Sequence, residues 1–166
     1  DATVTVAYTQ NSSAYITGTN GGNKVATVSI PQNVTVTNDN TRPTITDVSG
    51  VDKGGGYTDN DVVPITVTFS EVVVVTGGNA QIELETGSSD GLATYASGSG
   101  TDKLLFNYTV GAGETASDLD YKATSSFKYI AQNASIKDNA GNLAILDLAS
   151  PGAAGSLAHG NAIEIA

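Results

Sequence analysis

The sequence predicts an all-β protein built as an antiparallel β-sandwich. Apolar and polar residues alternate over several short stretches, which is the pattern of strands that bury one face. Turn signals rich in glycine, asparagine and serine recur about every eight to twelve residues, as they do in sandwiches. Thr, Ser, Gly and Asn dominate the composition, and no amphipathic stretch carries helix caps.

The first part of the chain, residues 1–42, predicts four short strands. They cover residues 1–8, 14–17, 24–30 and 33–37. Val4, Val6 and Tyr8 share one face of the first strand, and Val28 and Ile30 share one face of the third. Four short strands do not close a two-layer core. We therefore expect a short N-terminal β-strand arm, or part of a preceding repeat, that contacts another subunit through these five residues.

The joint between the two parts lies at residues 36–45. It turns through Asn38, Asp39 and Asn40, and Pro43, which has no N–H for a strand ladder, begins the next strand. From residue 43 to residue 166 the chain is expected to form one complete sandwich domain. Its predicted strands cover residues 44–48, 63–69, 71–76, 81–85, 92–96, 103–110, 118–121, 127–131, 135–137, 143–148 and 162–165.

The net charge of −10 and the absence of cysteine exclude several classes of protein. Seven scattered Lys and Arg residues do not neutralise the phosphates of a nucleic acid. No apolar run approaches the ~18 residues of a membrane span. Without disulfides, stability must come from the core, from metal ions or from association, and acidic side chains suit divalent cations. Because the chain starts at Asp1, we expect a processed form or a fragment of a longer protein.

Four carboxylates are candidates for a Ca²⁺ site at one pole of the domain. Asp59 and Asp61 fall in the long loop after the first strand, and Asp118 and Asp120 precede a late strand. If the first strand runs away from the joint, all four reach the same pole, where hard oxygen ligands suit Ca²⁺. The structural alternative is a tyrosine corner, in which the ring of Tyr121 fills the core and its hydroxyl bonds the backbone.

A second Ca²⁺ site is predicted at the joint. Asp39 and Asn40 lie in the turn, and Glu71 follows a long strand that returns toward it. Carboxylate, amide and backbone oxygens together suit a Ca²⁺ ion with about six or seven ligands. The alternative is a plain turn, since Asn and Asp cap their own backbone. Residues 137–142 are interpreted as a tight structural connection between two strands.

Catalytic groups are scarce, so no enzyme is expected. His159 is the only histidine and lies in a loop rich in Gly and Ala, whereas a catalytic triad needs an ordered imidazole. Glu83 and Glu85 lie on one face of a strand about 7 Å apart, which is within the range of an inverting glycosidase pair. We interpret this pair as part of a solvated outer face, because no aromatic or cationic residue flanks it in the sequence.

From residue 43 onward, the order of short motifs resembles the tandem Ig-like repeats of large bacterial surface adhesins and S-layer-type proteins. The matching motifs are residues 41–48 (TRPTITDV), 65–71 (ITVTFSE), 83–87 (ELETG), 93–100 (ATYASGSG), 119–121 (LDY), 136–142 (IKDNAGN) and 151–157 (PGAAGSL). The resemblance implies an Ig-like β-sandwich with Greek-key order on the outside of a bacterial or archaeal cell. The joint and residues 119–121 also resemble the calcium-bound linkers of cadherins, with Lys122 standing where an acid would be wanted.

Three functions are compatible with these expectations. The first is a non-catalytic structural module of a cell-surface fibre, filament or S-layer, in which strands of residues 1–42 add to the sheet of a neighbouring copy. The second is a cell-adhesion domain that binds a glycan or a protein, for example through exposed rings at Tyr15, Tyr57 and Tyr129. The third is a spacer module attached to a larger surface protein. Ca²⁺ is the expected cofactor, and other copies of the chain or neighbouring repeats are the expected partners.

Overall fold

The computed structural model describes five short strands within residues 1–38 and then residues 39–51, 54–78 and 80–166. The chain divides into two compact units, Asp1–Asn38 and Asp39–Ala166, which we call unit 1 and unit 2. The described residues contain strands and turns and no helix, so the all-β prediction is confirmed. Among them, therefore, no helix is long and apolar enough to cross a membrane.

The described residues of unit 1 form five strands of two residues each. β1 (Val6–Ala7), β2 (Tyr15–Ile16) and β5 (Val28–Ser29) form an antiparallel sheet, and β3 (Thr19–Asn20) pairs with β4 (Asn23–Lys24). Val6 and Val28, two of the predicted subunit contacts, both lie opposite Ile16 in register. The other three, Val4, Tyr8 and Ile30, lie outside the described residues, as does the predicted strand at 33–37.

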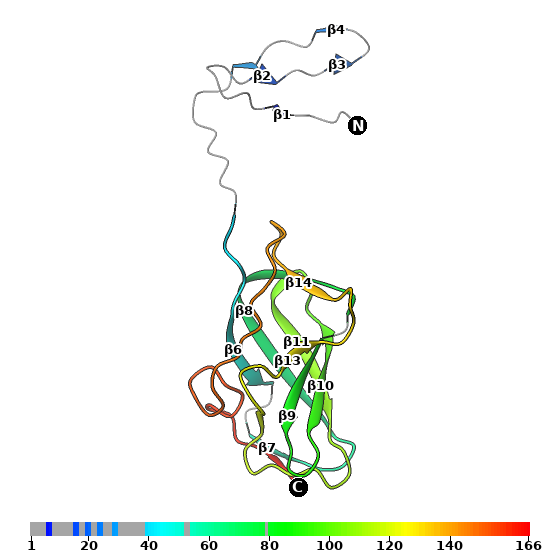
Figure 1. The fold of residues 1–166 in the computed structure, drawn as a ribbon, viewed down its shortest axis with the longest axis vertical. Helices are drawn as coiled ribbons and strands as arrows, with labels where there is room; N and C mark the ends of the chain where they lie inside the picture. The colour runs from blue at the N-terminus through cyan, green and yellow to red at the C-terminus, as the bar shows by residue number, and fades with distance from the viewer. Residues whose placement is uncertain are drawn as a thin grey trace. The chain divides into compact units, whose positions relative to one another are not determined.

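Unit 2 is a curled antiparallel sheet in the order β12-β9-β10-β11-β8-β14, with β6 also paired to β8 and β13 to β9 (Figure 1). This arrangement is consistent with the predicted sandwich. The strands of this sheet are β6 (Ile45–Gly50), β8 (Val62–Thr76), β9 (Ala80–Glu85), β10 (Gly91–Ser97), β11 (Thr101–Thr109), β12 (Asp120–Tyr121), β13 (Phe127–Tyr129) and β14 (Ser135–Lys137). A parallel pair, β7 (Gly55–Tyr57) and β15 (Ile163–Ile165), completes the unit.

The longest strand, β8, joins two paired regions of the sheet. Its first half pairs with β11 on one side and β6 on the other, and its last residues pair with β14. The sequence predicted two strands here, at 63–69 and 71–76. The structure has a single strand, because the alternation of buried and exposed residues continues through residues 70–72 without a change of phase.

The core lies between the inward faces of these strands. Alternate residues of β8 are buried, namely Val63, Ile65, Val67 and Phe69. The same holds for β9 and β11, where the buried residues include Ile82, Leu84, Leu104, Phe106 and Tyr108. The ring of Phe106 packs edge-on against Tyr95 and against Phe127, with centroids 5.9 and 5.3 Å away. Apolar strands of a half-buried sheet therefore explain the core without Trp, Met or Cys.

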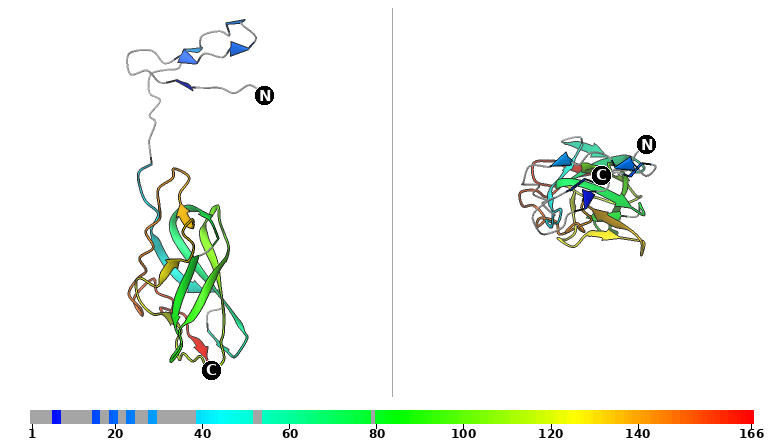
Figure 2. Two further views of the ribbon diagram at one scale, coloured as in Figure 1. Left: turned by 45° about the vertical axis from the view of Figure 1, so that its right-hand side comes forward. Right: turned by 90° about the horizontal axis from the view of Figure 1, so that it is seen from above.

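Residues 143–156 form an irregular segment, with turns from residue 151 onward, that runs along the sheet (Figure 2). Backbone N–H groups of Ala144, Ile145 and Leu148 donate to three separate parts of the chain, at residues 136, 43 and 124, and Gly155 accepts from β6. The predicted strand at 143–148 is therefore wrong, because its hydrogen bonds are shared among several neighbours and form only isolated bridges. This cover shields the edges of β6 and β14 from pairing with other chains.

Candidate metal centre

Three carboxylates from distant parts of unit 2 come together at its first residues. Asp39 is the first residue of the unit, Glu71 lies in the middle of β8, and Asp138 follows β14. One carboxylate oxygen from each lies within 4.8 Å of the others. Asp39 is exposed, Glu71 is half-buried and Asp138 is buried, so the group lies at the protein surface with one firmly enclosed member.

The turn at residues 138–142 fixes the orientation of Asp138. Asn142 donates to both carboxylate oxygens of Asp138, from its backbone N–H to Oδ1 at 2.8 Å and from Nδ2 to Oδ2 at 2.6 Å. Gly141 has a φ of +97°, a conformation that side chains disfavour. A glycine at this position therefore allows the chain to fold back on the carboxylate.

The segment that carries Asp39 is tied to the same turn. Asn142 Nδ2 also donates to the backbone carbonyl of Asp39 at 2.9 Å. The backbone N–H of Thr41 donates to Asp39 Oδ1 at 2.9 Å, and Arg42 Nε donates to the carbonyl of Leu143 at 2.7 Å. The cluster is thus held by contacts that span about a hundred positions of the sequence, with a separation of 103 between Asn142 and Asp39.

The electrostatics of the cluster follow from burial and from the proximity of like charges. Burial raises the pKa of Glu71 above its ordinary value, and the charges of Asp39 and Asp138 raise it further. Burial acts to raise the pKa of Asp138 too, but hydrogen bonds from the side chain of Asn142 and from the N–H groups of residues 140–142 outweigh it and lower that pKa. Asp138 is therefore held as an anion, and its negative charge disfavours ionisation of the neighbouring Glu71 carboxyl group.

The donor set suits a hard divalent cation. Oxygen ligands are those preferred by Ca²⁺ and Mg²⁺, and the cluster contains neither His nor Cys. The ion pairs found within the described ranges, Lys122–Asp90 and Lys128–Glu83, involve other acids. The negative charge of the cluster is thus available to a metal ion.

Two of the acids predicted at the joint lie close together. The structure brings Asp39 and Glu71 together, as the predicted return of the long strand requires. Asn40 is exposed and follows Asp39 in the sequence. Asp138 was interpreted from the sequence as part of a structural turn. The turn is present, and its first acid also faces the joint. Only the pairing of β14 with the end of β8 places it there, and the local sequence carries no signal for that pairing.

The four acids predicted at the opposite pole have separate environments. Asp61 Oδ2 accepts from the N–H and hydroxyl of Thr58 at 2.8 and 3.0 Å, and Asp59 and Asp118 are exposed. Asp120 is 9% exposed, and its two oxygens accept from the N–H groups of Tyr121 and Gly152, each at 2.8 Å. Within the described part of the chain, the group of three acids described above is the one found with oxygens this close.

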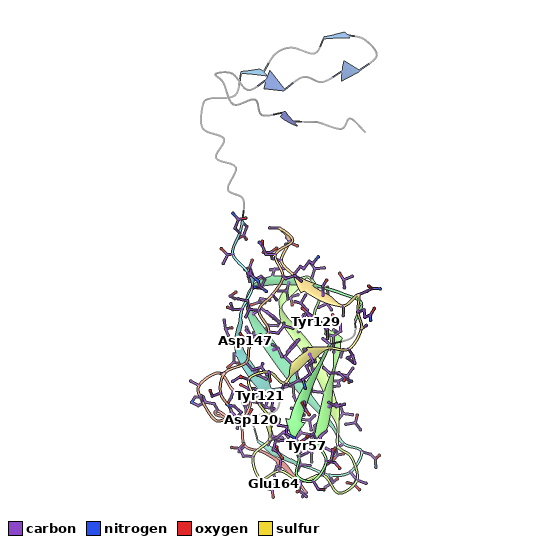
Figure 3. All side chains as sticks on the ribbon, in the orientation of Figure 1. Tyr57, Asp120, Tyr121, Tyr129, Asp147 and Glu164 are labelled. Carbon is purple, nitrogen blue, oxygen red and sulfur yellow. The ribbon has the colours of Figure 1, made fainter. Side chains whose placement is uncertain are left out.

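Two features of the structural alternative at Tyr121 are present, a buried ring and a hydroxyl that bonds the backbone. Tyr121 follows Asp120 in unit 2 (Figure 3). Its ring is 1% exposed, and its hydroxyl donates to the carbonyl of Ala149 at 2.7 Å. Burial raises the pKa of Tyr121 to about 12, with smaller contributions from Asp120 and Asp47. A tyrosine corner bonds backbone a few residues upstream, whereas this hydroxyl bonds backbone 28 residues downstream. Asp120 and Tyr121 together therefore fasten the loop at residues 149–152.

The residues that were considered for catalysis or sugar binding lie in separate parts of the chain. Lys128 Nζ donates to Glu83 at 2.8 Å on the outer face of β9, and His159 is exposed in a turn. The rings of Tyr57 and Tyr129 are half-buried against the core rather than exposed, and the side chain of Tyr15 lies outside the described set. No family model, curated protein or solved structure matched the chain.

Proposed function

We propose that this chain is a non-catalytic structural module of an extracellular fibre or filament on a bacterial or archaeal cell surface, with Ca²⁺ bound by Asp39, Glu71 and Asp138. The observation that carries the proposal is the acidic cluster at the first residues of unit 2. A cation there would fasten the start of the unit to β8 and to the turn after β14. In a fibre, a pulling force acts on the domain through its first residues. A fibre module therefore needs these residues to be firmly attached to the rest of the domain.

The choice of Ca²⁺ rests on the flexibility of its coordination. Ca²⁺ takes about six to eight oxygen ligands in irregular geometry, so water and backbone carbonyls can complete a set of three carboxylates. Mg²⁺ demands a nearly ideal octahedron and keeps its waters, which fits an irregular set of loop and strand residues less well. Extracellular fluid also contains Ca²⁺ at concentrations at which extracellular modules bind it.

Thermal unfolding with and without metal tests the site. A ligand that binds only the folded state adds about 2.7 kcal/mol of stability at a concentration ~100-fold above its Kd. We expect the melting temperature to rise from excess chelator to millimolar Ca²⁺, and to rise less with Mg²⁺. Asp138→Asn should abolish the rise, whereas Asp59→Asn, at the other predicted site, should retain it. An unchanged melting temperature in the unmodified chain would remove the metal from the proposal.

Strand addition by unit 1 is the proposed means of assembly. Its described residues form strands of two residues each, and small isolated sheets are marginally stable alone. Pairing with the sheet of another copy would extend them, and a head-to-tail contact that does not close produces a filament. Negative-stain microscopy of the whole chain should show filaments, and a chain beginning at Asp39 should show none. Monomers in light scattering at high concentration would contradict this assembly.

A further inference from the structure

Two buried side chains in the loop before β15, residues 149–162, each carry an oxygen atom that has no hydrogen-bond partner within the described part of the chain. The atoms are Ser156 Oγ and Asn161 Oδ1. Ser156 is 1% exposed and Asn161 is 5% exposed, so bulk solvent does not reach them. A buried oxygen without a partner loses the hydrogen bonds that water gives it in the unfolded chain, and such atoms are rare in folded proteins. These two oxygens therefore point to a ligand.

The loop that carries them is fastened to the rest of unit 2. The carbonyl of Gly155 accepts from the N–H of Val48 in β6 at 3.0 Å, and Figure 1 shows the loop beside that strand. The N–H of Gly152 donates to Asp120 Oδ2 at 2.8 Å. Leu157 is 0% exposed and belongs to the core. These contacts keep the loop in place, so the two oxygens stay enclosed in the folded unit.

The carboxamide of Asn161 is oriented by its nitrogen. Nδ2 donates to the carbonyl oxygen of Leu157 at 2.8 Å. Only the amide nitrogen can donate to a carbonyl, so the oxygen is the end that is left without a partner. Leu157 follows Ser156 in the chain. The unpaired carboxamide oxygen and the unpaired hydroxyl therefore both belong to side chains beside the same short stretch of backbone.

The backbone around these side chains is already hydrogen-bonded. The N–H of Ser156 donates to Ala153 at 2.9 Å, that of His159 donates to Ser156 at 3.1 Å, and that of Asn161 donates to Ala158 at 3.4 Å. These bonds close three turns in succession. A shift of the backbone toward either oxygen would break one of them, so the missing partner is better supplied by a bound molecule than by the loop itself.

The chemistry of the two oxygens selects a neutral ligand that both donates and accepts. Asn161 Oδ1 only accepts, whereas the hydroxyl of Ser156 carries a proton that needs an acceptor. A water molecule can donate to the first and accept from the second. A metal ion in a buried site needs a compensating charge. The buried carboxylate that contacts this loop, Asp120, already accepts from the N–H groups of Tyr121 and Gly152.

We propose that Ser156 and Asn161 bind one internal water molecule, which bridges Ser156 Oγ and Asn161 Oδ1. Folded proteins contain about one buried water per ~27 residues, each with about three hydrogen bonds to buried polar groups. This water joins the buried middle of the loop to the residues just before β15, and it is part of the folded unit. The inference depends on neither the acidic cluster nor assembly into a fibre.

A high-resolution crystal structure of the whole chain tests the proposal directly. We expect density for one water within about 3.2 Å of both Ser156 Oγ and Asn161 Oδ1. A direct hydrogen bond between the two side chains, a dry contact between them, or a metal ion at this position would each overturn the proposal.

The variant Ser156→Ala gives a second measurement in solution, because the sign of its effect differs between a hydrated and a dry site. If water bridges the two side chains, the variant removes one of its partners, and the urea midpoint of unfolding should fall. If the hydroxyl is dry and unpaired, its removal should raise the midpoint. Ser150→Ala, at an exposed position of the same loop, is the control and should leave the midpoint unchanged. A raised or unchanged midpoint for Ser156→Ala would contradict the bridging water.

Melting in different salts distinguishes water from a monovalent cation. The unmodified chain in chelator should melt at the same temperature in NaCl, KCl and choline chloride at equal ionic strength, because a neutral ligand does not depend on the salt cation. A higher melting temperature in one metal salt that Ser156→Ala abolishes would mean that a cation occupies the site, and the proposal would be wrong.

Discussion

Glu71 occupies a position in β8 that the alternation of the strand directs toward the core. Residues 63, 65, 67, 69 and 73 of the same phase are buried, and Glu71 between them is half-buried. The carboxylate is accommodated because the partner on one side of β8 changes at this point, from β6, which pairs as far as Phe69, to β14, which pairs from Val74. The alternation of the strand predicts a buried apolar residue at this position, and the structure has instead an acid that belongs to the cluster.

Removing the charge of Glu71 should stabilise the metal-free protein near neutral pH. Folding raises the pKa of this group, so its contribution to stability is present below the unfolded pKa and is lost as pH rises through the folded pKa. In chelator at pH ~7, Glu71→Gln should therefore melt at a higher temperature than the unmodified chain. The difference should vanish below the ordinary value of 4.5. Glu85→Gln, at an exposed position of β9, is the control, and a lower melting temperature for Glu71→Gln in chelator would contradict the argument.

The hydroxyl of Tyr121 should contribute measurably to stability. Its hydrogen bond to Ala149 is made by a buried ring, so Tyr121→Phe should lower the free energy of unfolding in urea by about 1 kcal/mol. Tyr95→Phe removes a hydroxyl that accepts from the exposed N–H of Ser99 at 3.2 Å, and it should cost less. Equal losses in the two variants would show that the fastening of the loop at residues 149–152 has no special weight.

At the scale of elements, the connection between β10 and β11 depends on a glycine for steric reasons. Gly98 has a φ of +107°, and a Cβ there would lie 2.2 Å from the carbonyl oxygen of Lys103. Gly100 has a φ of +87° with nothing within 4 Å of a Cβ. Both substitutions to alanine strain the backbone, by about 1–2 kcal/mol each.

Only Gly98→Ala adds a clash with backbone. It should therefore lower the free energy of unfolding in urea by at least ~1 kcal/mol more than Gly100→Ala does. Because both positions share a left-handed backbone, the difference between the two variants isolates the steric contribution. Equal losses would mean that the connection relaxes to admit the methyl group.

The elements that the sequence predicted best are those with strict alternation. β9 and β11 carry apolar residues at every second position, and period-two burial follows directly from the pleat of a strand. The segment at 143–148 was predicted as a strand from the same kind of pattern, but its partners are Pro43, Ile136 and Thr124. A local pattern indicates which residues avoid water, and tertiary topology decides whether one neighbour or several take up their hydrogen bonds.

At the scale of the whole molecule, the sequence predicted those residues of the candidate site that lie near one another along the chain, and it missed the distant one. Asp39 and Glu71 were paired from the sequence because the long strand that was predicted before Glu71 returns toward the joint. Asp138 was missed because it comes from a turn about a hundred residues from Asp39, and its role depends on the pairing of β14.

The cover formed by residues 143–156 also sets an order of events for a chain that emerges with its N-terminus first. β9, β10 and β11 follow one another and pair as neighbours, so this part can form from local contacts. The edge of β6 is covered only by residues 145 and 155, which lie about a hundred positions later in the sequence. During synthesis, the sheet therefore exists with an open edge until residue 155 has appeared. Conditions that delay these last residues would favour mispairing between nascent chains, even for a sequence whose finished fold resists it.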